Sequence, residues 1–283
     1  MDIMSNITDS ELTQIIQTIR SVSNYDFSEY SDKSLKRRFV KILMDLRISG
    51  SELMRQLKTQ PKFAEDVAKR ITVNTTEMFR DPPVWFSLRG EVLPKLAQRP
   101  IIRIWHAGCS SGQEVYSMII LLNEMGLLNK TEIYASDLNT DVIDVAKSGT
   151  YKYKFNIGYL DNFDKVIRND INNPLIVRDV PYSKYFEIDN VADKLKIHDQ
   201  FLSKPNYAKL DLVRDGNIFN VSFDLIMCRN VIIYFNYGLQ NKIFQLYHSN
   251  LNNDGFLMLG LHESILGPFA AKFEKKGYYY LRK

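Results

Sequence analysis

The chain has 283 residues, of which 45% are hydrophobic and 25% charged, which is typical of a soluble globular protein of about two domains. It carries 37 Lys and Arg against 33 Asp and Glu, and this net charge of +4 is too mild to make nucleic acid the expected partner. Its two cysteines exclude a disulfide framework. The sequence shows no secretion signal and no apolar run long enough to span a membrane, so we expect a cytoplasmic protein.

The first seventy or so residues predict helices throughout. Apolar side chains recur there at helical spacing in three sets: Leu12, Ile15, Ile16 and Ile19; Leu35, Phe39, Ile42, Leu43 and Leu46; and Phe63, Val67 and Ile71. Residues 29–70 hold eleven Lys and Arg against six Asp and Glu, and one run carries much of this charge: Lys33, Lys36, Arg37, Arg38 and Lys41. This basic run is either a solvated helix face or a surface for an acidic partner. We expect a helical domain over residues 1–80.

From residue 101 onward the pattern alternates between strands and helices. Short apolar runs at 101–105, 132–136, 223–228 and 255–259 predict strands, and helical periods lie between them. Alternation of this length predicts a parallel sheet covered by helices. Short alternating runs around 180–205 predict a small antiparallel insertion. We therefore expect an α/β domain over residues 81–283 with an inserted β-subdomain.

The turn from Gly108 to Gly112 lies between an expected strand and an expected helix. Its small residues let a ligand approach the backbone at the carboxyl edge of the sheet. It is not G-x-G-x-x-G and has no Gly-Lys-Ser/Thr, so a pyrophosphate ligand is weakly supported. Asp137 ends the next strand, where it can accept hydrogen bonds from ribose hydroxyls or cap the following helix. A nucleoside ligand such as S-adenosylmethionine fits this pair better than NAD.

Other polar residues have both a structural and a functional interpretation. Asn74 and Glu77 have the spacing of a capping box, and Asp81 is expected to cap a helix that opens with two prolines. Arg80 lies at the junction of the helical and α/β parts, where it makes a structural ion pair or lines a ligand site. Arg229 follows a strand end, and Tyr234 is a core aromatic or a site residue.

Several other chemistries are excluded by spacing. The four histidines have no metal-ligand spacing, and Cys109 and Cys228 form no C-x-x-C motif, so we expect no metal site. His106 is expected to be a strand-end residue rather than a catalyst. The serines near it lack the G-x-S-x-G elbow of a hydrolase.

Taken together, the motifs resemble the chemotaxis receptor protein-glutamate O-methyltransferases, the CheR family. The resemblance covers nearly the whole chain and rests on five blocks in order: Asn74-Thr-Thr-Glu-Met-Phe-Arg80, Ala107-Gly-Cys-Ser-Ser-Gly-Gln-Glu-Val-Tyr-Ser117, Ala135-Ser-Asp137, Cys228-Arg-Asn-Val-Ile-Ile-Tyr-Phe235 and Gly260-Leu-His-Glu-Ser264. It implies a Rossmann-like S-adenosylmethionine-dependent methyltransferase domain with a small inserted antiparallel β-subdomain, preceded by an all-α N-terminal domain that recognises the substrate.

The resemblance also implies roles for individual residues. The cofactor S-adenosylmethionine, which leaves as S-adenosylhomocysteine, would be contacted by Asn74, Thr76, Arg80, Gly108, Glu114, Asp137, Asp211, Leu212, Arg229 and Asn230. Arg80 and Tyr234 would be the catalytic residues closest to the transferred methyl group. A carboxylate is already ionised near neutral pH, so this reaction needs orientation rather than a general base.

The implied function is methyl transfer to glutamate side chains of chemoreceptors, which forms methyl esters in chemotaxis adaptation. The implied partners are the cytoplasmic helices of chemoreceptors, which the basic run could attract electrostatically. The stretch from Glu187 to Ile197 is shorter than the loop in members that dock a receptor's C-terminal pentapeptide. Two alternatives stay open: the same fold acting on another sensory-pathway protein, and a non-catalytic S-adenosylmethionine-binding module.

Overall fold

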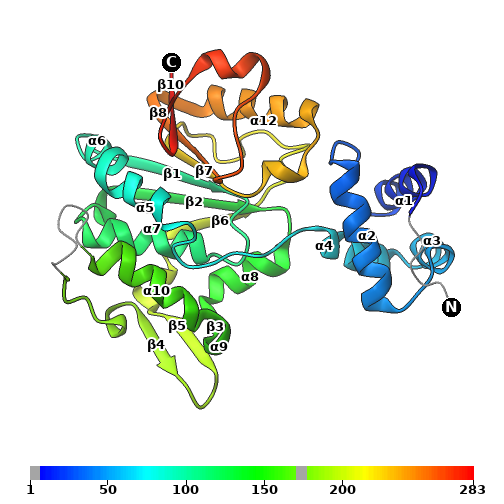
Figure 1. The fold of residues 1–283 in the computed structure, drawn as a ribbon, viewed down its shortest axis with the longest axis horizontal. Helices are drawn as coiled ribbons and strands as arrows, with labels where there is room; N and C mark the ends of the chain where they lie inside the picture. Colours follow the sequence, from blue (N-terminus) through cyan, green and yellow to red (C-terminus); the bar gives the residue numbers. More distant parts are fainter. Residues whose placement is uncertain (1–6, 170–176) are drawn as a thin grey trace. The chain divides into compact units, whose positions relative to one another are not determined.

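The computed structural model describes residues 7–169 and 177–283 (Figure 1). The chain divides into two compact units: one comprises the residues up to Val73 together with Ile232–Ile243, and the other comprises Asn74–Val231 and Phe244–Lys283. Within the described ranges, no helix is both long enough and apolar enough to cross a membrane.

The first unit is built from helices, as the apolar spacing predicts. They are α1 (Asp9–Val22), α2 (Asp32–Leu46), α3 (Gly50–Thr59) and α4 (Pro61–Ile71). Each helix buries the apolar side chains that recur at helical spacing along one of its faces, for example Leu12, Ile15 and Ile19 in α1. Helix α1 begins with a capping box between Thr8 and Glu11, and α4 has Pro61 in its first turn.

The second unit contains a seven-stranded sheet with the order β6-β2-β1-β7-β8-β10-β9. The strands are β1 (Ile102–Ala107), β2 (Thr131–Asp137), β6 (Pro205–Lys209), β7 (Phe223–Cys228), β8 (Leu251–Leu259), β9 (Phe273–Lys276) and β10 (Tyr279–Arg282). The first five are parallel, and β10 pairs antiparallel with both β8 and β9. Because β1 is flanked by β2 on one side and β7 on the other, the strand order reverses at β1. Open α/β sheets bind their ligands at such a point.

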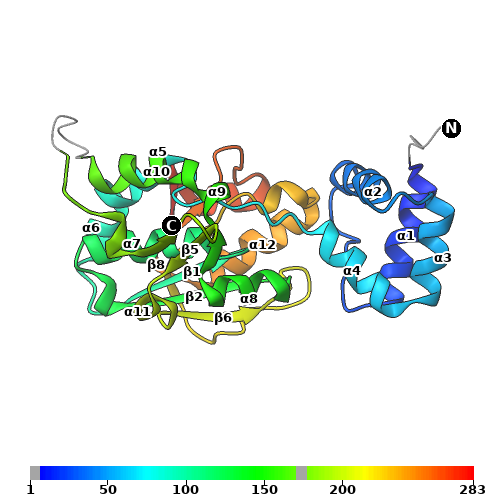
Figure 2. The ribbon, with the colours of Figure 1, turned by 90° about the horizontal axis from the view of Figure 1, so that it is seen from below.

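Helices cover this sheet and a smaller sheet joins it. The longer helices are α5 (Pro82–Ser87), which continues through a π turn (Leu88–Val92) into α6 (Leu93–Leu96), α7 (Gln113–Glu124), α8 (Thr140–Ser148) and α12 (Tyr237–Asn250). Short helices are α9 (Tyr153–Asn156), α10 (Leu160–Phe163) and α11 (Asp199–Leu202). Ile104 of β1 belongs to the core that includes α5 and α7, while its neighbour Trp105 packs its ring on Tyr247 of α12. The predicted α/β fold is therefore confirmed (Figure 2).

The expected antiparallel insertion is also present. It is a three-stranded sheet with the order β3-β5-β4, formed by β3 (Thr150–Lys152), β4 (Phe186–Asp189) and β5 (Lys194–Ile197). Both pairings are antiparallel. Strand β3 lies directly after α8, and Tyr151 of β3 and Leu195 of β5 belong to the same core as Val115 of α7.

Candidate functional site

The carboxyl ends of the parallel strands bring most of the expected site residues to one edge of the second unit. Gly108 follows β1, Asp137 ends β2, Asp211 lies just beyond β6, and Arg229 follows β7. Parallel neighbours end at the same edge, so segments far apart in the sequence meet there. We treat this edge, with the segment from Asn74 to Asp81, as the candidate site.

The turn after β1 needs glycine at both of its ends. Gly108 has a φ of +83°, and a Cβ there would lie 2.5 Å from a methyl group of Val231. Gly112 has a φ of +89°, and a Cβ there would lie 2.8 Å from the Cβ of Ala146. The hydroxyl of Tyr151, from the small sheet, donates to the carbonyl of Ser111 at 2.8 Å. Backbone conformation, close packing and a distant side chain therefore fix the shape of this turn.

Asp137 accepts hydrogen bonds with both carboxylate oxygens. Its Oδ2 accepts from the N–H of Ser110 at 2.8 Å and its Oδ1 from the N–H of Asn139 at 2.9 Å. Burial nevertheless raises the pKa of Asp137, because these bonds only partly offset the loss of water. The expectation that Asp137 caps the next helix is wrong: α8 begins at Thr140, and its cap is Asn139.

Ser110 joins the turn to the segment before α5. Its hydroxyl donates to the carbonyl of Asn74 at 2.9 Å, and its N–H is the one bound by Asp137. The expected capping box at Asn74 and Glu77 is wrong, because the chain from Thr72 to Asp81 forms no helix. The tertiary contact with Ser110, rather than a helix start, fixes the backbone at Asn74.

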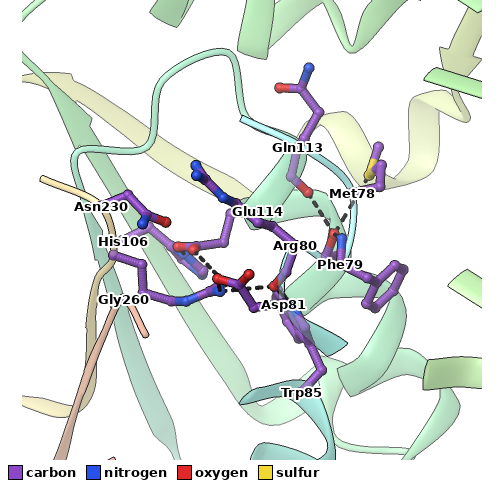
Figure 3. Close-up of polar contacts among 12 residues, drawn as sticks. Met78, Phe79, Arg80, Asp81, Trp85, His106, Gln113, Glu114, Asn230 and Gly260 are labelled. Atoms are coloured by element: carbon purple, nitrogen blue, oxygen red, sulfur yellow. Dashed lines mark hydrogen bonds and ion pairs between the residues drawn. The ribbon is translucent and has the colours of Figure 1, made fainter. Parts of the chain in front are cut away.

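Arg229 is the centre of a buried ion-pair cluster. Its side chain is only 1% exposed, and it binds Glu114 Oε2 at 3.1 Å and Asp81 Oδ2 at 2.9 Å. Glu114 also lies 2.9 Å from Nδ1 of His106, through its other oxygen (Figure 3). Burial would raise the pKa of Glu114, but the hydrogen bond with His106 and the charge of Arg229 together keep this pKa below its ordinary value. Glu114 is therefore ionised at neutral pH.

The same cluster fixes the backbone of Arg80. The Arg80 carbonyl accepts from Trp85 Nε1 at 2.9 Å and from an Arg229 guanidinium nitrogen at 2.8 Å. Its neighbours Phe79 and Asp81 both have positive φ, of 49° and 56°. The half-buried Arg80 side chain extends away from Trp85 (Figure 3), and its guanidinium lies 3.4 Å from the Thr75 carbonyl. The turn thus fixes the Arg80 backbone, while the guanidinium makes no contact with the Arg229 cluster among the described residues.

Asp81 has a role that the sequence did not predict. It stands at the N-cap position of α5, but its side chain makes no capping hydrogen bond and binds Arg229 instead. Trp85, Ser110 and Ser117 were also missed; Ser117 accepts the N–H of Phe79 at 2.8 Å. No spacing rule predicts these contacts, because Trp85 bonds to the carbonyl of Arg80 and the two serines bond to segments far away in the chain. The available signals were the family blocks, of which one contains Ser110 and Ser117 and another contains Glu263, the partner of Asn230.

The remaining expected residues are distributed between the two units. Asn230 has a φ of 60°, and its N–H donates to Glu263 Oε2 at 2.8 Å. The buried Asp211 and the half-buried Leu212 follow β6, and Leu210 donates to the Asp137 carbonyl at 3.0 Å. Thr76 is half-buried in the segment after Asn74. Tyr234 belongs to the helical unit, where it is partly exposed rather than a core aromatic.

Two buried nitrogens at this edge of the second unit are available to a ligand. Arg229 Nε and His106 Nε2 are buried and have no hydrogen-bond partner within the described residues. Burial raises the pKa of both Cys109 and Cys228, which keeps them as thiols. Across residues 7–169 and 177–283, no group of three His, Cys, Asp or Glu side chains is placed to hold a metal ion. A ligand with hydroxyl and carboxylate groups suits these residues.

Comparison with known proteins agrees with this geometry. The chain is similar to a Pseudomonas putida protein named as methyltransferase Cher3, with 36% identity over 94% of this chain and 93% of that protein. It is also similar to chemotaxis protein methyltransferases of Borreliella burgdorferi, with 28% identity over 93% of this chain and 90% of the relative, and of Listeria monocytogenes, with 26% identity over 86% of each.

The family model described as CheR methyltransferase, SAM binding domain, matches residues 74–159 and 175–279. This match spans nearly all of the second unit and includes the turn after β1, Asp137, and the Arg229 cluster. The cofactor of this domain is S-adenosylmethionine. The chain therefore belongs to the CheR methyltransferase family.

Proposed function

We propose that this chain transfers a methyl group from S-adenosylmethionine to glutamate carboxylates of chemoreceptors in chemotaxis. The observation that supports this most is the extent of similarity to chemotaxis protein methyltransferases, which covers 93% of this chain in one relative and 86% in another. The site adds chemical support. It offers the buried ion-pair cluster of Arg229 and a half-buried arginine, Arg80, while both cysteine thiols are buried with raised pKa values and so are poor nucleophiles.

For the cofactor, we propose contacts along the carboxyl edge of the sheet. Asp137 would accept hydrogen bonds from the ribose, since each of its oxygens has a lone pair beyond the one used by the backbone. Asp211 and Leu212 would lie near the adenine. Arg229 Nε, buried without a partner among the described residues, would donate to the carboxylate of the cofactor. Asn74, Thr76, Gly108, Glu114 and Asn230 would complete the contacts.

For the substrate, we propose that Arg80 attracts the glutamate carboxylate and that the Tyr234 hydroxyl orients one of its oxygens. When bound, S-adenosylmethionine supplies the methyl group and leaves as S-adenosylhomocysteine. The carboxylate is the nucleophile without deprotonation, so the protein's contribution is alignment, which can supply about 7–11 kcal/mol. Strong pairing of Arg80 with the reacting oxygen would weaken the nucleophile, so we assign Arg80 to steering.

The basic helix α2 is the proposed surface for the receptor. Lys33, Arg37 and Lys41 are exposed on it, while Lys36 pairs with Asp9 at 2.5 Å and Arg38 is half-buried. Exposed cations raise the rate of association with an acidic helix, and salt screens this effect. We therefore assign the receptor's encounter with the protein mainly to Lys33, Arg37 and Lys41.

The experiment that tests the function is a methyl-ester assay. The purified chain is incubated with radiolabelled S-adenosylmethionine and receptor cytoplasmic fragments, and base-labile methanol release is measured across a salt series. We expect ester formation whose kcat/KM falls with salt much more than kcat does. A Lys33→Glu, Arg37→Glu, Lys41→Glu variant should be slow and nearly insensitive to salt.

Two results would contradict the proposed methyl transfer, and a third would contradict only the role of α2. Labelling of another protein in base-stable form would favour the same fold with a different substrate. Tight cofactor binding in calorimetry without ester formation on any receptor fragment would favour a binding module. A kcat/KM that does not change with salt would remove the role of α2 while leaving the methyl transfer in place.

Cofactor affinity is expected to depend on pH through Asp137. Burial raises the pKa of this carboxyl, and only its ionised form can accept two ribose hydrogen bonds. Affinity for S-adenosylhomocysteine should therefore be highest at neutral pH and fall as the pH is lowered through the raised pKa. Asp137→Asn should weaken binding by about 10- to 100-fold at neutral pH and flatten the profile. Calorimetry between about pH 5 and about pH 8 checks this, and an unchanged slope in the variant would contradict it.

A further inference from the structure

Tyr234 is held by the segment that leads into the basic helix. The N–H of Ser31 donates to the Tyr234 carbonyl at 2.8 Å, and the N–H of Asn236 donates to the Glu29 carbonyl at 2.9 Å. These two bonds form an antiparallel bridge between Tyr30 and Phe235. All six residues lie within the helical unit. The backbone on both sides of Phe235, and therefore at Tyr234, is fixed by residues 29–31.

Aromatic packing anchors this bridge in the core of the unit. The rings of Tyr30 and Phe235 meet edge to face at 5.0 Å, and Tyr30 meets Phe27 in the same way at 5.1 Å. Phe27 and Phe235 are buried. Glu29 adds an ion pair with Lys242, at 2.6 Å, from the first turns of α12. Edge-to-face pairs stabilise beyond the area they bury, so the bridge is a rigid attachment rather than a passing contact.

The same segment is the start of α2. Ser31 is the N-cap residue of α2, yet its side chain makes no capping hydrogen bond, and its N–H is the one that binds the Tyr234 carbonyl. One residue therefore joins the first turn of the basic helix to Tyr234. The exposed cations Lys33 and Arg37 follow within two turns of it.

We propose that residues 29–31, with the Tyr30 ring as their anchor, are a positioning element for Tyr234. A receptor helix that binds α2 then engages a surface rigidly joined to the residue that orients its glutamate. This inference rests on the proposed function, because it takes its purpose from the roles of α2 and Tyr234. Tyr30 itself contacts neither substrate nor cofactor in this proposal.

A double-mutant cycle between Tyr30→Ala and Tyr234→Phe tests the inference. We expect each single variant to lower kcat on the receptor fragment by about tenfold, the loss of one neutral hydrogen bond. The double variant should be no slower than Tyr234→Phe, because Tyr30 acts through Tyr234. Tyr30→Phe keeps the ring and should restore kcat. The inference would be overturned if the fold-reductions in kcat of the two single variants multiplied in the double variant. It would also be overturned if folded Tyr30→Ala had the kcat of the wild-type chain.

A control variant and a second readout separate positioning from general destabilisation. Tyr25→Ala removes a buried ring that stacks on Phe27 at 6.2 Å but belongs to no part of the bridge. It should lower the melting temperature without reducing kcat at low temperature. Hydrogen exchange at the Ser31 and Asn236 amides should accelerate in Tyr30→Ala and not in Tyr25→Ala.

This exchange measurement also keeps the two proposals distinguishable, since it needs no substrate. Faster exchange in Tyr30→Ala, together with no ester formation by the wild-type chain, would overturn the proposed function while leaving the attachment of Tyr234 established. Ester formation by the wild-type chain with unchanged exchange in Tyr30→Ala would overturn the inference alone.

Discussion

Replacing Arg229 by methionine is expected to destabilise the second unit by about 3–5 kcal/mol. The guanidinium is 1% exposed and is shared by Glu114 and Asp81, so its loss leaves two carboxylates facing each other without a counter-charge. The Arg80 carbonyl also loses one of its two donors. Denaturation in urea, followed by tryptophan fluorescence, measures the loss in the free energy of unfolding.

An arginine in an exposed ion pair serves as the control, because its replacement removes the same charge without leaving buried carboxylates unpaired. Arg103 pairs with Glu132 at 2.7 Å, but their side chains are 35% and 43% exposed, so Arg103→Met should cost less than about 1 kcal/mol. Equal losses in the two variants would contradict the burial argument.

The loss in the free energy of unfolding caused by Arg229→Met should also depend on pH. In the folded wild-type chain the pKa of Glu114 is lower than in the unfolded chain, so ionised Glu114 stabilises the fold at pH values above its unfolded-state pKa. This stabilisation is lost as the pH falls through the pKa of Glu114 in the folded chain. Without Arg229, burial makes Glu114 protonate at higher pH. The difference in the free energy of unfolding between the wild-type chain and Arg229→Met should therefore be largest near neutral pH and become smaller as the pH is lowered.

Replacing Arg80 by alanine is expected to lower kcat/KM for ester formation by about 100-fold. The Arg80 side chain is half-buried, and its guanidinium makes only a long contact, 3.4 Å, with the Thr75 carbonyl among the described residues, so the loss should fall on function rather than on stability. We expect the free energy of unfolding to change by less than about 0.5 kcal/mol. Steady-state kinetics with receptor fragments, together with urea denaturation, measures both effects.

The conservative variant assigns the cause. Arg80→Lys keeps the charge but loses the planar fork of donors, so it should recover part of the activity. Trp85→Phe removes one donor to the Arg80 carbonyl and keeps the charge, and it should cost less than Arg80→Ala. Wild-type kcat/KM in Arg80→Ala would show that Arg80 steers neither substrate nor cofactor.

The fold and much of the edge could be predicted because their signals are local. The alternation of apolar runs correctly predicted β1, β2, β7 and β8 as strands of a parallel sheet, although their order came from the structure. Once the strands were parallel, Gly108 and Asp137 had to emerge at the same edge. The helical spacing of the first seventy residues similarly required the apolar stripes that α1 and α4 bury.

The caps were predicted less well, because two of the expected cap side chains bind distant partners. Asn74, Asp81 and Asp137 all match cap patterns, yet the side chain of Asp81 binds Arg229 and that of Asp137 binds the N–H of Ser110, while Asn74 accepts from Ser110 through its backbone carbonyl. A short polar side chain can satisfy either a helix end or a distant donor. A cap pattern in the sequence shows the helix end that the side chain could satisfy, but it does not show the distant donor.

The sequence by itself determined the class of fold, the edge where the strands end, and the family, because periodicity and motif order depend on neighbours along the chain. Only the tertiary structure decided that Arg229 bridges two acids, that Arg80 is anchored by Trp85, and that residues 232–243 join the helical unit. The physical reason is that these contacts join residues from about five to more than two hundred positions apart. Their partners are selected by packing in three dimensions, which no local pattern records.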